Sequence, residues 1–362
     1  MMTSYLYEYI YLLVCAIFLL TFLKRYRIPD IVFNNQVVSS VVNFIVIILT
    51  IFIGTRPVYV GSDTVQYTQH YQFILGKPFS WTNNAENLLF DNLFAFFGSL
   101  YVEIDVFFIV IAAIYFMCIA IATKKLFPQN QEIAFFSYLV AFSTYSYGTD
   151  GIKAGAGAAI FLVALAYRDR KALSILLALI SIGFHHSMVV VVYAYIISYF
   201  YKNTKMYFYG WIFATLIAIA HIGVFQEFFA SYADDKGKAY LTTSDGFMTG
   251  FRPDFILYSA MPVLVGYIMY IKRNVRDTIY ELWLRMYLMT NSVWMLCMYA
   301  SYTNRIAYLS WFMYPFVLLY PYLAMNVGSY QVKEGKNVVK YHMWFTIFMV
   351  VVYYGLLPLI RG

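Results

Sequence analysis

Side chains able to do chemistry are few in this chain, and a conspicuous group of them lies between Tyr145 and Ser187. Lys153 stands near the start of an apolar run rich in glycine and alanine, and His185 and His186 end the apolar run that follows. If both runs are helices joined by the short basic segment RDRK, an antiparallel pair brings the lysine and the two imidazoles to one end. A fixed cation could hold an anion there, and an imidazole could exchange a proton.

Each of these residues also has a structural interpretation. Lys153 could extend its ammonium group to a membrane interface, and Gly151 and Gly155 suit close helix packing. Adjacent histidines point about 100° apart on a helix, so one could pack while the other faces a cavity. No nearby carboxylate or cysteine completes a ligand set, so we expect no metal site. Walker A, Rossmann, HExxH and GxSxG motifs are absent from the sequence, and we expect no cofactor and no nucleic-acid partner.

An acid and two tyrosines share a helical spacing earlier in the chain. Asp63, Tyr67 and Tyr71 follow the i, i+4, i+8 pattern, which places them on one helix face. A carboxylate beside aromatic rings suits a sugar-binding groove, and Glu86 opens a second short helix nearby. The alternative is a pair of interfacial helices, with tyrosines in the aromatic belt and both acids near helix N-termini.

Several cations could share the same side of the protein. Arg56 precedes the Asp63 segment, Arg252 lies in GFRPD, and Arg305 lies in SYTNRIAYLSWFMYPFVLLYP. Together with Lys153 they suit a diphosphate or another polyanion. Each of the last two arginines could instead be an interfacial anchor.

Composition indicates the elements that must position these residues. With 62% hydrophobic and only 12% charged residues in 362, the chain has too little polar surface for a soluble globule. We therefore predict an all-α polytopic membrane protein, a single transmembrane domain over residues 1–362 with about twelve crossings and short interfacial helices in its outer loops. The first apolar run lacks a basic leader and a cleavage site, so we interpret it as a span and not as a signal peptide. The predicted spans are residues 5–23, 37–54, 104–123, 132–147, 152–167, 172–184, 187–200, 206–222, 255–272, 279–299, 304–325 and 341–360.

The positive-inside rule decides the orientation. If the run from 172 to 200 turns at His185 and His186 as a hairpin, most of the 25 basic residues fall on one side, which we assign to the cytoplasm. One continuous helix would put several lysines outside. With the hairpin, all the candidate site residues lie at the outer face, and the loops 54–103 and 223–254 form part of the site.

Several short motifs then follow one another in a characteristic order: Arg56 with GSDTVQYTQHY, Glu86 at a helix start, TDGIKAGAGAAIFLVAL, SIGFHHSM and NRIAYLSWFMYPFVLLYP. Over most of the chain this order resembles the EpsG family of bacterial exopolysaccharide polymerases, relatives of the Wzy-type O-antigen and capsule polymerases. Lys153 and Ala154 stand where that family commonly has arginine and glutamine. The lysine keeps the charge but lacks the bidentate guanidinium fork.

The resemblance implies a metal-independent glycosyltransferase of the GT-C type at the outer face of the bacterial cytoplasmic (inner) membrane. Its substrate would be oligosaccharide repeats linked to undecaprenyl diphosphate in the lipid bilayer, with a chain-length regulator and a flippase as expected partners. For the general base we order the candidates Asp63, His186 and Glu86. The candidates for binding the substrate and its diphosphate are Arg56, Lys153, His185, Arg252, Arg305 and Tyr67.

Two other functions remain open from the sequence. A multispan acyltransferase of surface polysaccharide would use a histidine base, although the predicted inner loops hold only basic patches for an acyl donor. A flippase or other carrier of lipid-linked sugars should show repeated halves, and no such internal symmetry occurs here.

Overall fold

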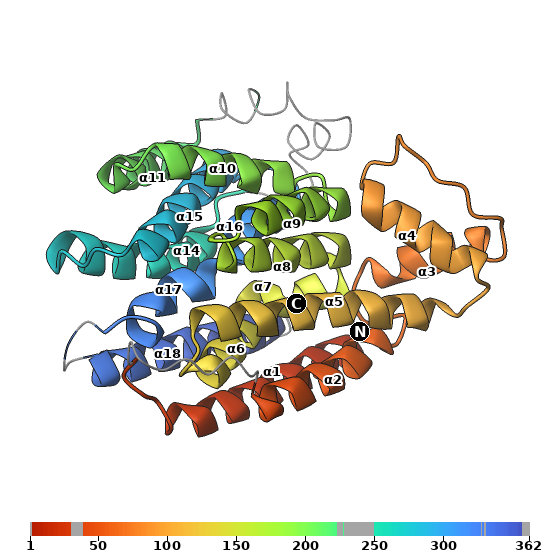
Figure 1. Ribbon diagram of the computed structural model, residues 1–362, viewed down its shortest axis with the longest axis horizontal. Coiled ribbons are helices and arrows are strands. Elements are labelled where there is room, and N and C mark those ends of the chain that lie inside the picture. The colour runs from red at the N-terminus through yellow and green to blue at the C-terminus, as the bar shows by residue number, and fades with distance from the viewer. Residues whose placement is uncertain are drawn as a thin grey trace. The chain divides into compact units, whose positions relative to one another are not determined.

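The computed structural model describes residues 2–29, 39–222, 227, 250–326, 328 and 331–356. These residues form helices and connecting turns, and the described part of the chain contains no strand. This agrees with an apolar chain that must satisfy its backbone hydrogen bonds within each segment. Two compact units are present, residues 1–188 with 322–362 and residues 189–321, and each is described by itself (Figure 1).

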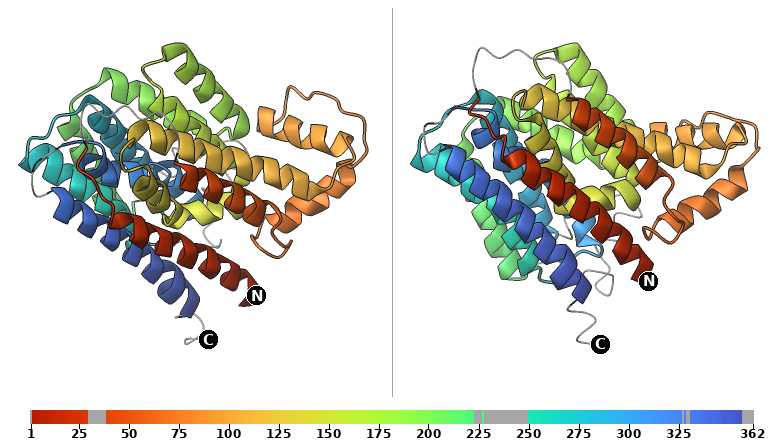
Figure 2. Two further views of the ribbon diagram at one scale, coloured as in Figure 1. Left: turned by 60° about the horizontal axis from the view of Figure 1, so that its bottom comes forward. Right: turned by 90° about the horizontal axis from the view of Figure 1, so that it is seen from below.

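The first unit contains the sequence of helices that carries most of the candidate residues. The long helix α5 (Ile104–Leu126) packs against α2 (Ser40–Gly54) and α8 (Ile152–Ala166), and α8 packs against α9 (Lys171–Phe184). Helix α18 (Gln331–Ile347) lies beside α1 (Met2–Leu23), as the two further views show (Figure 2). The other elements of this unit are α3 (Thr64–Ile74), α4 (Leu88–Ser99), α6 (Gln131–Leu139), α7 (Phe142–Thr149) and the π-helix η2 (Phe348–Leu356).

The second unit centres on α15 (Thr278–Leu296), against which α11 (Thr204–Ile219), α14 (Pro253–Gly266) and α16 (Thr303–Trp311) pack. Buried hydrogen bonds join these helices, because Asn291 Nδ2 donates to Ser259 Oγ at 3.0 Å and to Ser310 Oγ at 2.9 Å. Fully satisfied buried polar groups of this kind fix the register of neighbouring helices. The remaining elements are α10 (Met188–Phe200), η1 (Tyr267–Lys272) and α17 (Tyr314–Leu323), the first and last of which run across the boundary between the units.

Helices long and apolar enough to cross a membrane confirm the predicted class. Among the described residues there are four, Ser4–Leu23, Ile104–Leu126, Pro253–Lys272 and Thr303–Leu323. At about 1.5 Å per residue they reach roughly 30 Å, the thickness of the hydrocarbon core. The other apolar helices, among them α2, α8 and α9, have 10–17 residues. The chain is an α-helical membrane protein, whereas twelve crossings and a single domain stay predictions.

Several predicted boundaries need correction. The predicted span 132–147 is wrong as one helix, because α6 ends at Leu139 and Ala141 is extended before α7 begins. The Thr144 hydroxyl donates to the Tyr138 carbonyl at 2.6 Å, which satisfies the backbone at this break. An apolar run gives no sign of such a turn. The chain also breaks at Phe312–Met313, inside the predicted span 304–325.

The predicted start of the last helix is wrong, and the predicted break at the two histidines is confirmed. Helix α18 begins at Gln331, well before the predicted start at residue 341. Hydropathy assigns the polar first half of this helix to a loop, but Gln331 and Val339 in that half are buried. The predicted break at His185 and His186 is confirmed, since α9 ends at Phe184 and α10 begins at Met188.

Helices α8 and α9 are antiparallel, as predicted. Ser174 Oγ donates to the Ala164 carbonyl at 2.9 Å, and Ser181 Oγ donates to the Gly157 carbonyl at 2.7 Å. This register continues toward Lys153 at the start of α8 and the histidines after α9. The small residues of α8 permit the close approach.

The first unit has a basic end, which we define as the ends of α1, α5 and α8 with the start of α9. Lys125 pairs with Asp169 at 3.7 Å, and the backbone N–H of Arg27 donates to Asn130 Oδ1 at 3.0 Å. These contacts join the α1, α5 and α8 ends. The prediction that these basic segments share one side is confirmed within this unit, and the start of α8 lies at the opposite end.

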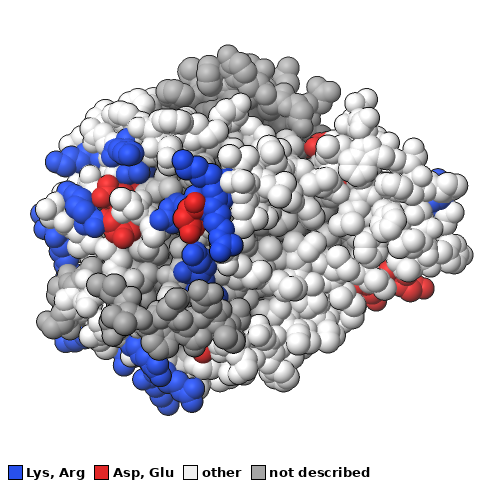
Figure 3. Space-filling model, viewed as in Figure 1, with Lys and Arg blue, Asp and Glu red and all other residues white. Residues whose placement is uncertain are grey.

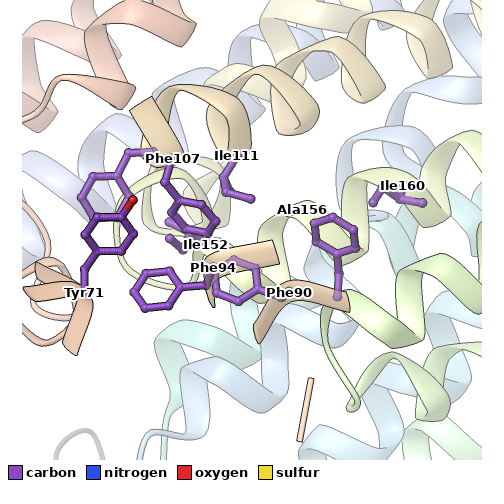
Figure 4. Packing of buried hydrophobic residues seen from close by; sticks show 10 residues of the cluster. Tyr71, Phe90, Phe94, Phe107, Ile111, Ile152, Ala156 and Ile160 are labelled. Atoms are coloured by element: carbon purple, nitrogen blue, oxygen red, sulfur yellow. The ribbon is translucent and has the colours of Figure 1, made fainter. Parts of the chain in front are cut away.

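An aromatic cluster seats α3 and α4 beside the start of α5 (Figure 4). The rings of Phe90 and Phe94 on α4 meet the edge of Phe107 on α5 at centroid distances of 5.4 and 5.0 Å. Tyr71 of α3 packs against Phe94 and donates its hydroxyl proton to the Val102 carbonyl at 3.0 Å. Each buried ring contributes about 2 kcal/mol, so α4 is firmly held. Figure 3 shows that the surface over α3 and α4 is mostly uncharged.

Candidate functional site

The start of α4 lies beside two of the groups predicted from the sequence, Lys153 and the histidine segment. Helix α4 packs against the end of α9, where Leu89 lies so close to Gly183 that a Cβ there would meet its Cγ at 2.5 Å. The residues just before and within the first turn of α4 therefore face both Lys153 and the histidine segment. We call the set Glu86, Asn87, Asp91, Lys153, His185 and His186 the Lys153 cluster.

Lys153 is the cation of this cluster. Its Nζ lies 3.2 Å from Asp91 Oδ1 and 5.3 Å from the centroid of the Phe90 ring. The side chains of Lys153 and Asp91 are 27% and 33% exposed, so the pair is reachable from outside the packed helices. Desolvation by the neighbouring rings strengthens the cation–π contact.

The imidazoles of His185 and His186 lie on the other side of the first turn of α4 from Lys153. Nδ1 of His186 is 3.6 Å from Glu86 Oε1, and the ring stacks on that of His185 with centroids 5.4 Å apart. Glu86 precedes α4, which begins at Leu88, so the prediction that Glu86 opens this helix is off by two residues. A carboxylate beside an imidazole nitrogen is a typical arrangement for orienting a base.

Two residues that were not predicted from the sequence connect Lys153 to the backbone of His186. Asp91 Oδ2 accepts from the backbone N–H of Asn87 at 3.0 Å, and Asn87 Oδ1 accepts from the backbone N–H of His186 at 3.1 Å. Asn87 is only 2% exposed. A continuous chain of contacts thus runs from Lys153 through Asp91 and Asn87 to His186. An acid in the first turn of an amphipathic helix was the available signal, and it is a weak one.

Arg56 is a buried anchor. Its Nε donates to Thr64 Oγ1 at 3.1 Å, its Nη1 to the Ile53 carbonyl at 2.9 Å and its Nη2 to the Thr149 carbonyl at 3.1 Å. The guanidinium also lies 4.2 Å from the centroid of the Phe108 ring. Burial lowers the pKa of Arg56 to about 10, and Asp150 acts in the opposite direction, so the group is protonated at neutral pH. Its predicted role in binding substrate stays a prediction.

Asp63 and Tyr67 lie in the segment that Arg56 holds. Asp63 precedes α3 without a side-chain capping bond and accepts from Ser62 Oγ at 3.3 Å. Ser62 also donates to Asp150, through its backbone N–H at 2.5 Å and its hydroxyl at 2.8 Å. Tyr67 packs among the rings of the aromatic cluster, with Phe90 at 6.1 Å. Asp150, which the sequence analysis did not single out, thus ties this segment to the residues just before Lys153.

Gly61 permits the close approach of this loop to α7. Its φ is +86°, and a Cβ there would lie 2.9 Å from the Thr149 carbonyl oxygen. We expect Gly61→Ala to lower the free energy of unfolding by about 2 kcal/mol, from the left-handed backbone and the clash together. Thermal unfolding in detergent checks this. Gly210→Ala in α11, where a Cβ meets nothing within 4 Å, is the control and should be neutral or stabilising. Equal losses in both would contradict the account.

The other predicted cations lie in the second unit. Arg252 precedes α14 and forms a two-pronged pair with Asp254, with Nε to Oδ1 at 3.0 Å and Nη2 to Oδ2 at 2.5 Å. Its guanidinium lies 3.7 Å from the centroid of the Phe255 ring. Arg305 in α16 lies over the Tyr302 ring at 5.0 Å. The predicted outer loop 223–254 falls, apart from Glu227 and residues 250–254, outside the described residues.

No group of three or more His, Cys, Asp or Glu side chains suited to a metal ion occurs in the described ranges. Metal independence of the activity stays a prediction.

These features define an α-helical membrane protein that gathers a lysine, paired histidines and carboxylates at one end of an antiparallel helix pair. The chain belongs to the EpsG family, whose family model matches residues 40–359. The resemblance predicted from the sequence is thereby confirmed. Membership indicates a polysaccharide-polymerase-like protein with glycosyltransferase-like activity. No curated protein and no solved structure matches the chain.

Proposed function

We propose that this protein is a polysaccharide polymerase that joins oligosaccharide repeats carried on undecaprenyl diphosphate. One observation carries the proposal beyond family membership: the first turn of α4 brings a cation, an imidazole and carboxylates together at the start of α8 and the end of α9. A transfer from a lipid diphosphate needs a cation at the leaving group and a base at the acceptor hydroxyl, and both are present in this cluster.

In the proposed reaction, an acceptor hydroxyl on a new lipid-linked repeat attacks the anomeric carbon of the growing chain. The bond from that carbon to the diphosphate oxygen breaks, and the electron pair leaves with the lipid diphosphate. Lys153 stabilises the developing negative charge on that oxygen, because a fixed ammonium group in a partly desolvated site needs little reorganisation. The hydroxyl proton passes to a base.

We propose His186, oriented by Glu86, as that base. Replacing His186 with Gln should lower kcat about 10²-fold to 10⁴-fold, because general-base catalysis contributes on that order. His70→Gln is the matched control: His70 is an exposed residue of α3 outside the Lys153 cluster, with its ring centroid 5.5 Å from that of Phe94, and the variant should retain most activity. Product length and rate with lipid-linked repeats check this. If Asp63→Asn carries the loss while His186→Gln does not, the base is Asp63.

We further propose that the Lys153 cluster faces outward from the bacterial cytoplasmic membrane. The basic end of the first unit supports this orientation, because cytoplasmic ends of spanning helices are enriched in Lys and Arg. Twelve crossings, a GT-C-like architecture and cooperation with a flippase and a chain-length regulator belong to the same proposal.

Surface polysaccharide from a strain lacking the protein tests the function against the other candidates. The polymerase assignment predicts single unpolymerised repeats on a gel. Accumulation of inward-facing lipid-linked repeat would indicate a carrier instead, and full-length polymer without acyl groups would indicate an acyltransferase.

A further inference from the structure

The Lys153 cluster contains more negative than positive charge around its one accessible cation. Lys153 is already paired with Asp91. Arg56 is buried, and its guanidinium donates hydrogen bonds within the protein. The carboxylates of this cluster are Asp91, beside Lys153, and Glu86, beside His186. A diphosphate that approaches Lys153 therefore has to compete with a carboxylate that the protein itself supplies.

Asp91 is well placed for this competition. One carboxylate oxygen holds the ammonium group at 3.2 Å, and the other accepts from the backbone N–H of Asn87 at 3.0 Å. The second bond fixes the carboxylate on the rigid start of α4, so it stays in place if Lys153 turns away. The pair is about one-third exposed, and partly exposed ion pairs are weak enough to exchange partners.

We propose that Asp91 is a positioning residue that competes with the substrate's diphosphate for Lys153 and so promotes release of the lipid diphosphate after transfer. In the resting site Lys153 is paired with Asp91. A bound diphosphate takes over the lysine, and Asp91 recovers it when the product leaves. This inference rests on the proposed function, because it assigns the anion to that reaction.

The inference gives a signature that a merely structural residue would not show. Asp91→Asn removes the competing charge, so inorganic pyrophosphate should bind the purified protein on the order of 2- to 5-fold more tightly, the range expected for one partly exposed charge. In turnover, KM and the inhibition constant for pyrophosphate should fall together, while kcat falls because product leaves slowly. Asp91→Glu restores the charge and should return all of these values toward those of the wild type.

Control variants separate an effect of the Asp91 charge on binding from an effect on folding. Asp105→Asn makes the same change in the first turn of the neighbouring helix α5, at an exposed position, and should leave pyrophosphate binding unchanged. Asp91→Ser keeps an acceptor for the Asn87 N–H without the charge, and serves if the Asn variant does not fold. The added tightening should disappear in a Lys153→Gln background, because the competition needs the lysine.

Calorimetric titration of detergent-solubilised protein with pyrophosphate, alongside turnover with the lipid-linked repeat, tests the inference. Tighter binding in Asp91→Asn and Asp91→Ser, lost with Lys153→Gln, supports it. Unchanged or weaker binding in folded Asp91 variants overturns it, whatever the turnover. If wild-type protein binds pyrophosphate but extends no chain, the proposed function fails separately.

Discussion

Replacing Lys153 with Ala should reduce chain extension about 10²-fold to 10³-fold while the protein still reaches the membrane. The reason is that a fixed charge at a leaving group contributes on that order to kcat, and Lys153 is the cation that the α4 turn positions in the cluster. Polymer length on gels and the initial rate with lipid-linked repeats measure the effect. Lys153→Arg should retain most activity, because it keeps the charge and adds a fork that suits phosphate.

Lys171→Ala is the matched control for that variant. Lys171 is the exposed first residue of α9, and it lies at the basic end of the same helix pair. The substitution removes one lysine from the start of a helix without changing the Lys153 cluster, so chain extension should be unchanged. Normal polymer length in Lys153→Ala would remove this lysine from the site.

Arg56→Lys should lower the free energy of unfolding by about 2–4 kcal/mol. Three donors of the guanidinium are used at once, on Thr64 and on the carbonyls of Ile53 and Thr149, and a lysine cannot reach all three. The loss of buried hydrogen bonds from a charged donor accounts for a loss of this size. Thermal unfolding in detergent and the yield of folded protein measure it.

The same variant distinguishes an anchor from a ligand for the substrate. A lysine keeps the positive charge, so a purely electrostatic role toward a diphosphate would survive with normal stability and a modest change in KM. The exposed Arg27, substituted as Arg27→Lys, is the control and should not change stability. Normal stability of Arg56→Lys would contradict the anchoring described here.

The sequence predicted the features that depend on apolar length and charge. The antiparallel α8 and α9, the break at His185 and His186 and the common side of the basic segments of the first unit all follow from hydropathy, small residues and positive charge. These properties are local or additive along the chain. The break between α6 and α7 was missed, because both halves are apolar and the turn depends on a hydroxyl reaching back to a carbonyl.

The hydrogen bonds and ion pairs that connect the residues of the Lys153 cluster could not be predicted from the sequence. Asp91 and Asn87 act through contacts made possible by the seating of α4 on the end of α9, and that seating depends on the aromatic cluster and on the absence of a side chain at Gly183. Arg56 was expected beside a diphosphate on the basis of its charge. Its partners in the structure are the Thr64 hydroxyl and the carbonyls of Ile53 and Thr149, and the contact with Thr149, far away in the sequence, follows from no spacing pattern.

A single reaction tests the central claim most directly: purified protein in detergent, supplied with undecaprenyl-diphosphate-linked repeats and no other enzyme. The account predicts a ladder of longer lipid-linked glycans, with one undecaprenyl diphosphate released for each new glycosidic bond. Repeats that stay single, with folded protein present and no lipid diphosphate released, would contradict it.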